Sequence, residues 1–123
     1  IFFITTLDNT SRYTNLMYEI AAKHKYPPKE VGIYVQPLEQ GRACHCEYGL
    51  HLNPNVPEEV GLVNGLWKEA CEALMANGAF FSNPYGALAP MVYGRCAAYY
   101  TALRRLKEVF DPNRVMNPGK LCL

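Results

Sequence analysis

The stretch from Val31 to Leu52 carries the side chains with the widest chemical capability in this sequence. Its pattern predicts a strand over Val31–Leu38, a turn at Glu39–Gly41 and a second strand over Arg42–Leu52. Successive side chains of a strand point to opposite faces of the sheet. On the second strand, one face therefore holds Ala43, His45, Glu47 and Gly49, and the other holds Arg42, Cys44, Cys46 and Tyr48.

The position of the turn decides which residues of the two strands lie opposite each other. We place its centre near Glu39-Gln40, and Tyr34 then lies opposite His45. In the same register, Gln36 lies opposite Ala43. Directly opposed side chains are about 5 Å apart at Cβ. One face then carries a group able to transfer protons or to bind a phenol: Tyr34, Gln36, His45 and Glu47.

A solvent-exposed polar sheet face is the competing interpretation of the same four residues. An exposed face is usually rich in Lys, Thr and Ser, whereas this one combines a phenol, an amide, an imidazole and a carboxylate. The residue types favour a functional face, and the alternation alone leaves both interpretations open.

The cysteines do not form a recognisable framework. Their number is odd and their spacing matches no disulfide scaffold, and we expect no secretory segment before them. They are Cys44, Cys46, Cys71, Cys96 and Cys122. We expect reduced thiols in a cytoplasmic protein. We expect no metal site, because His45 points away from Cys44 and Cys46 on a strand and no second ligand pair exists.

Composition bounds the class of protein. The chain has 123 residues, of which 50% are hydrophobic and 19% charged, as in a globular domain with a real core. A net charge of +1 argues against a nucleic-acid platform. No apolar run approaches the roughly 20 residues that a membrane helix needs. The densest basic cluster, Arg104, Arg105 and Lys107, is typical of a solvated helix face.

The elements that position the hairpin follow from periodicity. Ile1–Leu7 is β-branched and aromatic, which predicts a strand, and the chain begins in it without Met, so we expect a longer protein. One helix is predicted to follow the N-cap candidates at residues 8–11. A second is predicted from Pro57 to Asn77-Gly78, and a third is predicted to end at Phe110. The apolar segment 78–95 is expected to be irregular and to line something buried. The order predicts an α+β fold, an antiparallel sheet with helices on one face, as in half of a ferredoxin-like arrangement.

The C-terminal stretch "DPNRVMNPGKL" contains more turn-forming residues than a frayed chain end needs. It predicts one turn at Asp111–Asn113 and another at Asn117–Gly119. Val115 and Met116 are two apolar anchors between the turns. Two interpretations remain open from the residues: a lid that only packs, and a segment that lays its backbone against another domain.

The same stretch resembles the C-terminal signature of FAD-linked oxidases of the vanillyl-alcohol oxidase and p-cresol methylhydroxylase superfamily. That signature is D-P-N-x, two hydrophobic residues, then N/A-P-G-K, and residues 111–120 match it throughout. The resemblance implies that residues 1–110 are the C-terminal part of a substrate (cap) domain. It implies that residues 111–123 dock on an FAD domain, which lies upstream in the same chain or in another subunit.

The hairpin is similar to the central hairpin of the p-cresol methylhydroxylase cap domain. The resemblance implies catalytic roles for His45 and Gln36, with Tyr34 beside them. It implies substrate contacts from the set Tyr85, Phe81, Ser82, Asn83 and Glu47. Ser82 and Asn83 stand where that branch has a Tyr-Arg pair, so this chain departs from the pattern there. The cofactor contacts implied are Asn117, Lys120 and Arg42.

The activity implied by the resemblance is FAD-dependent oxidation of a small alkylphenol-like or hydroxy-acid-like substrate, by hydride transfer to the flavin. The implied partners are the substrate, the FAD domain, an electron-acceptor protein and a further copy of the chain in a homo-oligomer. A binding or assembly module without flavin of its own, or a subunit of a split flavoenzyme, is the alternative.

Overall fold

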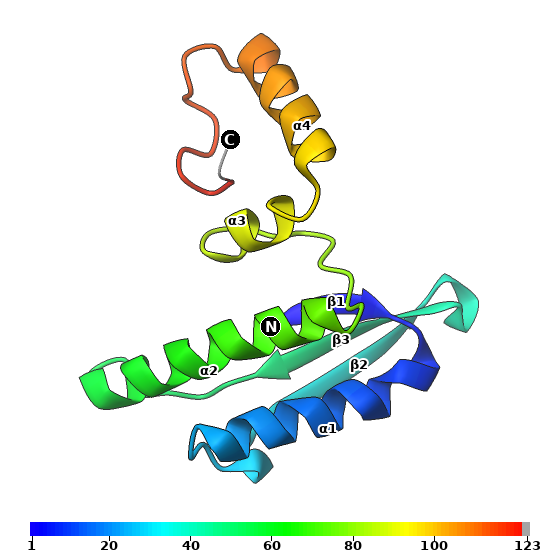
Figure 1. Cartoon of the computed structure of the whole chain (residues 1–123), viewed down its shortest axis with the longest axis vertical. Helices are drawn as coiled ribbons and strands as arrows, with labels where there is room; N and C mark the ends of the chain where they lie inside the picture. The colour runs from blue at the N-terminus through cyan, green and yellow to red at the C-terminus, as the bar shows by residue number, and fades with distance from the viewer. Residues whose placement is uncertain (122–123) are drawn as a thin grey trace. The chain divides into compact units, whose positions relative to one another are not determined.

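The chain divides into two units, Ile1–Ser82 and Asn83–Leu123. The computed structural model describes residues 1–121. Unit 1 contains β1 (Phe2–Thr5), α1 (Leu7–Lys23), β2 (Gly32–Leu38), β3 (Ala43–Gly49) and α2 (Pro57–Ala76). Unit 2 contains α3 (Leu88–Tyr93), α4 (Ala97–Phe110) and the C-terminal tail. Figure 1 shows both helices of unit 1 on the same side of its sheet.

The sheet of unit 1 is antiparallel with the strand order β1-β3-β2. Beyond β1, Phe80 forms an isolated antiparallel bridge with Ile4, through backbone hydrogen bonds of 2.8 and 3.1 Å. That bridge occupies the place of the fourth strand in a ferredoxin-like fold, reduced to one residue. The predicted α+β class, with helices on one face of an antiparallel sheet, is confirmed.

Helix α1 begins earlier than its polar N-terminal residues suggested. The helix starts at Leu7, and the extended residue Thr6 is its N-cap, so residues 8–11 lie inside the first two turns. The prediction that the cap lies among these residues is wrong. Asp8 still favours this end, because a carboxylate interacts well with the exposed N–H groups of a first helical turn. The buried stripe of α1 consists of Tyr13, Met17, Ile20 and Ala21.

Helix α2 follows its predicted limits at both ends. Pro57 occupies the first turn, where its missing N–H costs no helical hydrogen bond. At the other end Gly78 has a φ of 93°, and its N–H bonds to Met75 O at 3.2 Å. The N–H of Ala79 bonds to Leu74 O at 3.0 Å. These two bonds form a Schellman cap, which turns the chain back towards the sheet.

The core of unit 1 lies between the sheet and its two helices. Phe3 is fully buried at its centre and packs edge-on against Tyr13, with ring centroids 5.2 Å apart. Its ring also lies 5.9 Å from Tyr48 and 5.7 Å from Phe81. Cys44, Cys46 and Tyr48 point into the same core from β3. Burial of these side chains removes apolar surface from water and is the main force that holds the helices on this face.

Unit 2 is built from two helices and the tail. The segment 78–95, expected to be irregular, contains the short helix α3. Pro90 is tolerated there because it is the third helical residue, and the first four N–H groups of a helix have no partner inside it. Helix α4 ends at Phe110, directly before Asp111, as predicted. Along α4 no residue is fully buried in the part of the chain that the structure describes.

Candidate functional site

The face of the sheet turned away from the helices carries the polar residues of the hairpin. Residues paired across an antiparallel sheet share a face, so the register places side chains from all three strands together. Tyr34 and Phe2 lie on either side of Glu47, and Gln36 and Ile4 lie on either side of His45. We call this surface the open face; its members are Phe2, Ile4, Gly32, Tyr34, Gln36, Leu38, Ala43, His45, Glu47 and Gly49.

The predicted grouping on one face is present, but the predicted register is wrong. Tyr34 lies opposite Glu47 rather than His45, and Gln36 lies opposite His45 rather than Ala43. The strands are joined by four residues, with Leu38 paired to Ala43, so the turn centre lies one residue later than assumed. That displaces the pairing by two residues. Because side chains alternate with a period of two, the displacement leaves each one on its predicted face.

His45 is the most enclosed polar side chain of the open face. Its ring stacks on Phe2, with centroids 5.8 Å apart and an interplanar angle of 25°. The ring of Tyr34 meets it edge-on at 6.1 Å. Its side chain is 28% exposed, and Nε2 lies 3.5 Å from a carboxylate oxygen of Glu47. When Nε2 carries the proton that points to Glu47, Nδ1 keeps a lone pair that can accept another proton.

Tyr34 and Gln36 lie along the exposed strand β2. The Tyr34 hydroxyl donates a hydrogen bond of 3.2 Å to Oε1 of Gln36. Tyr34 is 53% exposed, so its hydroxyl and the Gln36 amide remain open to a ligand. The open face thus offers a phenol, an amide, an imidazole and a carboxylate within neighbouring sheet positions. This combination can orient a hydroxyl group and remove its proton.

The sequence did not single out the contribution of β1 to this face. Phe2 and Ile4 flank the polar residues of β3, and Phe80, which is 64% exposed, extends the same row beyond Ile4. Alternation inside the short stretch 2–5 shows that Phe2 and Ile4 share a face. Only the strand order, which depends on tertiary packing, places that face beside His45.

The thiols of β3 lie on the opposite side of the sheet from His45, as alternation predicted. Burial raises the pKa of Cys46, although a hydrogen bond with Tyr48 opposes part of that shift. Burial also raises the pKa of Cys71 on α2 to about 12. Both groups are therefore protonated near neutral pH and are poor nucleophiles. Cys122 lies outside the described residues.

Metal ligation has no geometric support in the described region. Within residues 1–121, no three His, Cys, Asp or Glu side chains converge closely enough to hold a metal ion. No helix of that region is both long and apolar enough to cross a membrane.

The remaining predicted substrate-binding residues belong to both units. Phe81 packs in the core against Phe3, on the helix side of the sheet, so it does not line the open face. Ser82 is exposed at the end of unit 1. Asn83 and Tyr85 are exposed residues of unit 2. Of that predicted set, the register brings only Glu47 next to His45.

The predicted cofactor contacts fall in two places. Arg42 lies in the exposed loop between β2 and β3. Asn117 and Lys120 lie in the tail, where Lys120 N–H bonds to Asn117 O at 3.3 Å and closes the second predicted turn. Asn117 has a φ of 48°, a left-handed conformation that asparagine adopts more readily than most residues. The carbonyl of Lys120 accepts a 2.7 Å bond from Gly86 N–H, so the tail folds back on the start of α3.

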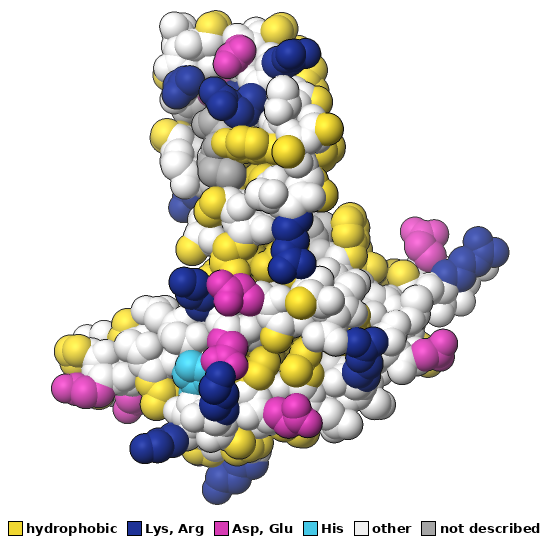
Figure 2. All heavy atoms as spheres, in the orientation of Figure 1, with side chains coloured by type: hydrophobic (Ala, Val, Ile, Leu, Met, Phe, Trp, Pro, Cys, Tyr) yellow, Lys and Arg dark blue, Asp and Glu magenta, His cyan; other side chains and the backbone are white. Residues whose placement is uncertain are grey.

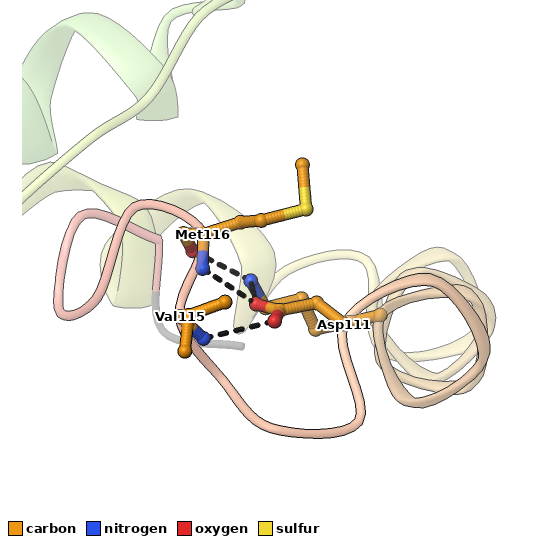
Figure 3. A network of polar contacts seen from close by, with 4 residues as sticks. Asp111, Val115 and Met116 are labelled. Carbon is orange, nitrogen blue, oxygen red and sulfur yellow. Dashed lines mark hydrogen bonds and ion pairs between the residues drawn. The ribbon is translucent and has the colours of Figure 1, made fainter.

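A buried carboxylate organises the tail. Asp111 is 4% exposed and accepts hydrogen bonds from the N–H groups of Val115 and Met116, at 2.8 and 3.0 Å (Figure 3). Lys107 of α4 forms an ion pair with the same carboxylate and donates to Met116 O at 2.7 Å. The hydrogen bond and charge of Lys107, together with the two backbone N–H groups, lower the pKa of Asp111 despite its burial. Lys107 therefore has a specific partner, whereas its neighbours Arg104 and Arg105 are exposed as predicted.

Unit 2 presents apolar surface along α4 and the tail. Between them lies a groove of about 410 Å³, lined in part by Leu103, Leu106, Phe110 and Met116. Val115 is 74% exposed and Met116 56%, so the two side chains expected to anchor the tail are not covered within the described chain. Phe110, at the end of α4, is 75% exposed. Figure 2 shows apolar side chains at the surface in the region of α4. Exposed apolar area of this kind marks an interaction surface.

Comparison with known proteins gives one match, and it falls on this same part of unit 2. Residues 91–121 match the family model of FAD linked oxidases, C-terminal domain. The match spans about a quarter of the chain, from the end of α3 through α4 and the tail. No curated protein and no solved structure matches the chain. The match supports an FAD-linked oxidase C-terminal domain and therefore an oxidoreductase context.

Proposed function

We propose that this chain is the C-terminal portion of an FAD-dependent oxidoreductase of the vanillyl-alcohol oxidase and p-cresol methylhydroxylase superfamily. It would oxidise a small alkylphenol-like or hydroxy-acid-like substrate. The observation that carries the proposal is the family match over residues 91–121, which includes the whole D-P-N…N-P-G-K signature at residues 111–120. The open face of unit 1 supplies acid-base and aromatic side chains suited to the substrate side of such a site.

The side chains of unit 1 suit the substrate better than the phosphates of FAD. The open face holds aromatic rings, an imidazole, a carboxylate and an amide. Phosphate groups are usually cradled by a glycine-rich loop at a helix N-terminus. We therefore propose that an FAD domain, upstream in the same chain or in another subunit, holds the cofactor. When bound, the flavin supplies the acceptor for a hydride from the substrate carbon.

His45 is the proposed proton acceptor. With Nε2–H directed to Glu47, its Nδ1 can take the proton of a substrate hydroxyl while the carbon gives up its hydrogen with the electron pair. Gln36 and Tyr34 would orient the oxygen by hydrogen bonds. Phe2 holds the imidazole ring by stacking on it.

The C-terminal segment of unit 2 is the proposed attachment to the FAD domain. We propose that residues 111–123 dock there, with residues 1–110 in the cap domain. Asn117, Lys120 and Arg42 stay the proposed cofactor contacts, and Tyr85, Ser82 and Asn83 the proposed substrate contacts. The exposed apolar groove beside α4 supports a docking role for the tail. A cytoplasmic location, an electron-acceptor protein and a homo-oligomer belong to the same proposal.

The test replaces His45 with alanine in the flavin-loaded protein. We expect H45A to lower turnover by about 10²–10⁴-fold, the usual contribution of a general base, while flavin content stays unchanged. The matched control is H51A, because His51 is an exposed loop residue of unit 1 whose backbone, rather than its ring, bonds to Tyr26. Equal turnover of H45A and H51A at equal flavin loading would remove His45 from the mechanism.

A binding or assembly module without its own flavin is the second candidate. The observation in its favour is that the family match leaves all of unit 1 uncovered. A visible absorption spectrum of the native protein separates the two candidates. Flavin bands support the oxidoreductase, and their position after acid precipitation, in pellet or supernatant, tells covalent from non-covalent flavin. A colourless protein supports the module or a split enzyme.

A further inference from the structure

Strand β2 has one edge that no other strand covers within residues 1–121. It is the last strand in the order β1-β3-β2. In an antiparallel sheet the N–H and C=O of one residue point to the same side, and successive residues alternate. Tyr48 N–H of β3 bonds to Ile1 O at 2.8 Å, on the β1 side, so the backbone groups of its neighbour Glu47 point to β2. The residue opposite Glu47 therefore bonds to β3, whereas the backbone groups of Ile33 and Val35 point away from the sheet.

The same strand is incompletely covered on the helix side of the sheet. Ile33 lies opposite Tyr48, which is fully buried, and Val35 lies opposite Cys46, which is also fully buried. Ile33 is nevertheless 42% exposed, so the packing of the helices ends before this edge. The seven residues of β2 include no charged side chain, whereas natural edge strands often carry one that prevents pairing with another chain. Open backbone groups and an exposed isoleucine suit this edge to a further strand.

A second copy of β2 fits this edge in one register. Two residues restrict the choice, because Pro37 has no N–H and Val31 N–H already bonds within its own turn at 3.2 Å. A twofold axis at Val35 would place Ile33 opposite Pro37. An axis at Ile33 would place Val35 opposite Val31. With the axis at Tyr34, Ile33 lies opposite the partner's Val35, and both members of each pair can donate and accept a hydrogen bond.

The ends of the strand agree with the same register. The axis at Tyr34 places Pro37 opposite the partner's Val31, so the two residues that offer no donor at this edge face each other. Beyond them, the antiparallel direction brings exposed Lys29 of one copy towards exposed Glu39 of the other. The edge is therefore complementary to itself in its backbone donors and in its flanking charges, as a twofold interface requires.

We propose that two copies of this chain associate by antiparallel pairing of their β2 strands about a twofold axis at Tyr34. The two sheets then form one continuous sheet, and the open faces of both copies lie on the same side of it. Tyr34 lies opposite the partner's Tyr34, with about 5 Å between Cβ atoms, so each copy adds a phenol to the edge of the other's open face. The inference specifies the interface of the proposed homo-oligomer and does not depend on the proposed oxidation.

Cysteine cross-linking in the native protein tests the register. Y34C sets two substituted positions directly opposite each other, with about 4.5 Å between their Cα atoms, which a disulfide can span. Q36C is the matched control on the same strand and face, because Gln36 lies opposite the partner's Gly32 and about 13 Å along the strand from its own copy. Under mild oxidation we expect Y34C to form a dimer linked at the substituted position, identified by peptide mapping. We expect Q36C to stay unlinked there.

Sedimentation equilibrium of the native protein measures the association itself. I33P removes an outward N–H and no bond to β3, and Pro37 shows that β2 accepts proline in this phase of the strand. Symmetry makes the substitution remove two interface hydrogen bonds, so we expect the Kd of the dimer to rise about 10–100-fold. I33K places a lysine at the edge and should also weaken the dimer, whereas V109K, at an exposed residue of α4, should not.

Melting curves establish that each variant is folded, and I33K decides the test if I33P does not fold. A monomeric wild-type protein in the micromolar range would overturn the inference, as would equal linking of Y34C and Q36C. Equal association of I33K and V109K would also overturn it. A colourless protein that is dimeric and linked through Y34C would refute the proposed function and support this interface, so the two failures are distinguishable.

Discussion

Replacing Gly78 with alanine tests whether the Schellman cap of α2 holds the last part of unit 1 in place. Gly78 has a φ of 93°, and a Cβ there would lie 3.7 Å from the Tyr13 hydroxyl, an ordinary contact. The cost of G78A is therefore conformational. An L-residue in the left-handed region loses about 1–2 kcal/mol. That loss corresponds to a roughly 5–30-fold change in the ratio of closed to open states.

Hydrogen exchange followed by mass spectrometry measures this change locally. In the closed cap, the N–H groups of Gly78 and Ala79 are bonded to carbonyls of α2, and Phe80 is bonded to Ile4. We expect the peptide that contains these amides to exchange about 5–30-fold faster in G78A. G78N should lie between G78A and the wild type, because asparagine tolerates a positive φ better than alanine.

G61A is expected to change the stability of the same helix in the opposite direction. Gly61 lies inside α2 without a positive φ, so alanine there should stabilise the helix by about 0.5–1 kcal/mol. Equal exchange of the cap amides in G78A and the wild type would refute the conformational argument. Acceleration in both G78A and G61A would show that the effect comes from any change in α2.

Three further predictions concern ionisable groups. D111N should speed amide exchange in the tail that this carboxylate holds, whereas D8N, at an exposed position in the first turn of α1, should not. The pKa of Asp111 is lowered in the folded protein, so its stabilisation of the tail is present above the unfolded pKa of about 4 and is lost as pH falls through the lower folded value. Exchange measured at descending pH, corrected for intrinsic rates, should show tail loosening only in this acidic range; loosening near pH 7 would contradict the assignment. Among the described cysteines, iodoacetamide at pH 8 should label exposed Cys96 before Cys46 and Cys71, whose pKa values are raised by burial, and peptide mapping showing the reverse order would refute their inertness.

The sequence predicted the chemistry of the open face better than its geometry. Alternation along the hairpin depends only on the strand backbone, so His45 and Glu47 were placed on one face correctly. The register depends on the loop, and here Glu39 and Gln40 both adopt a positive φ that favours glycine. The centre that we placed near Glu39-Gln40 therefore lies one residue too early. The resulting error displaced the strand pairing by two residues. Because side chains alternate with a period of two, each one stayed on its predicted face.

Contacts between distant parts of the chain could not be predicted in this way. That Phe2 stacks on His45 depends on β1 pairing with β3, and no local signal carries the strand order. The core position of Phe81 likewise depends on the turn after α2. In the tail, both turns were visible in the prolines, glycine and asparagines. The contacts of the Asp111 carboxylate were not predicted. They are its hydrogen bonds with the N–H groups of Val115 and Met116 and its ion pair with Lys107, one helical turn earlier.

The bond between Gly86 N–H and Lys120 O brings together two backbone points separated by α3, α4 and most of the tail. The two ends of this segment are joined by one hydrogen bond of 2.7 Å, so they lie as close together as the two ends of a surface loop. We therefore expect residues 86–120 to be suitable for insertion into a surface loop of an unrelated carrier protein, because their two ends already lie side by side. Such a chimera would present the α4 surface without unit 1, and would allow the affinity of that surface for the proposed FAD domain to be measured.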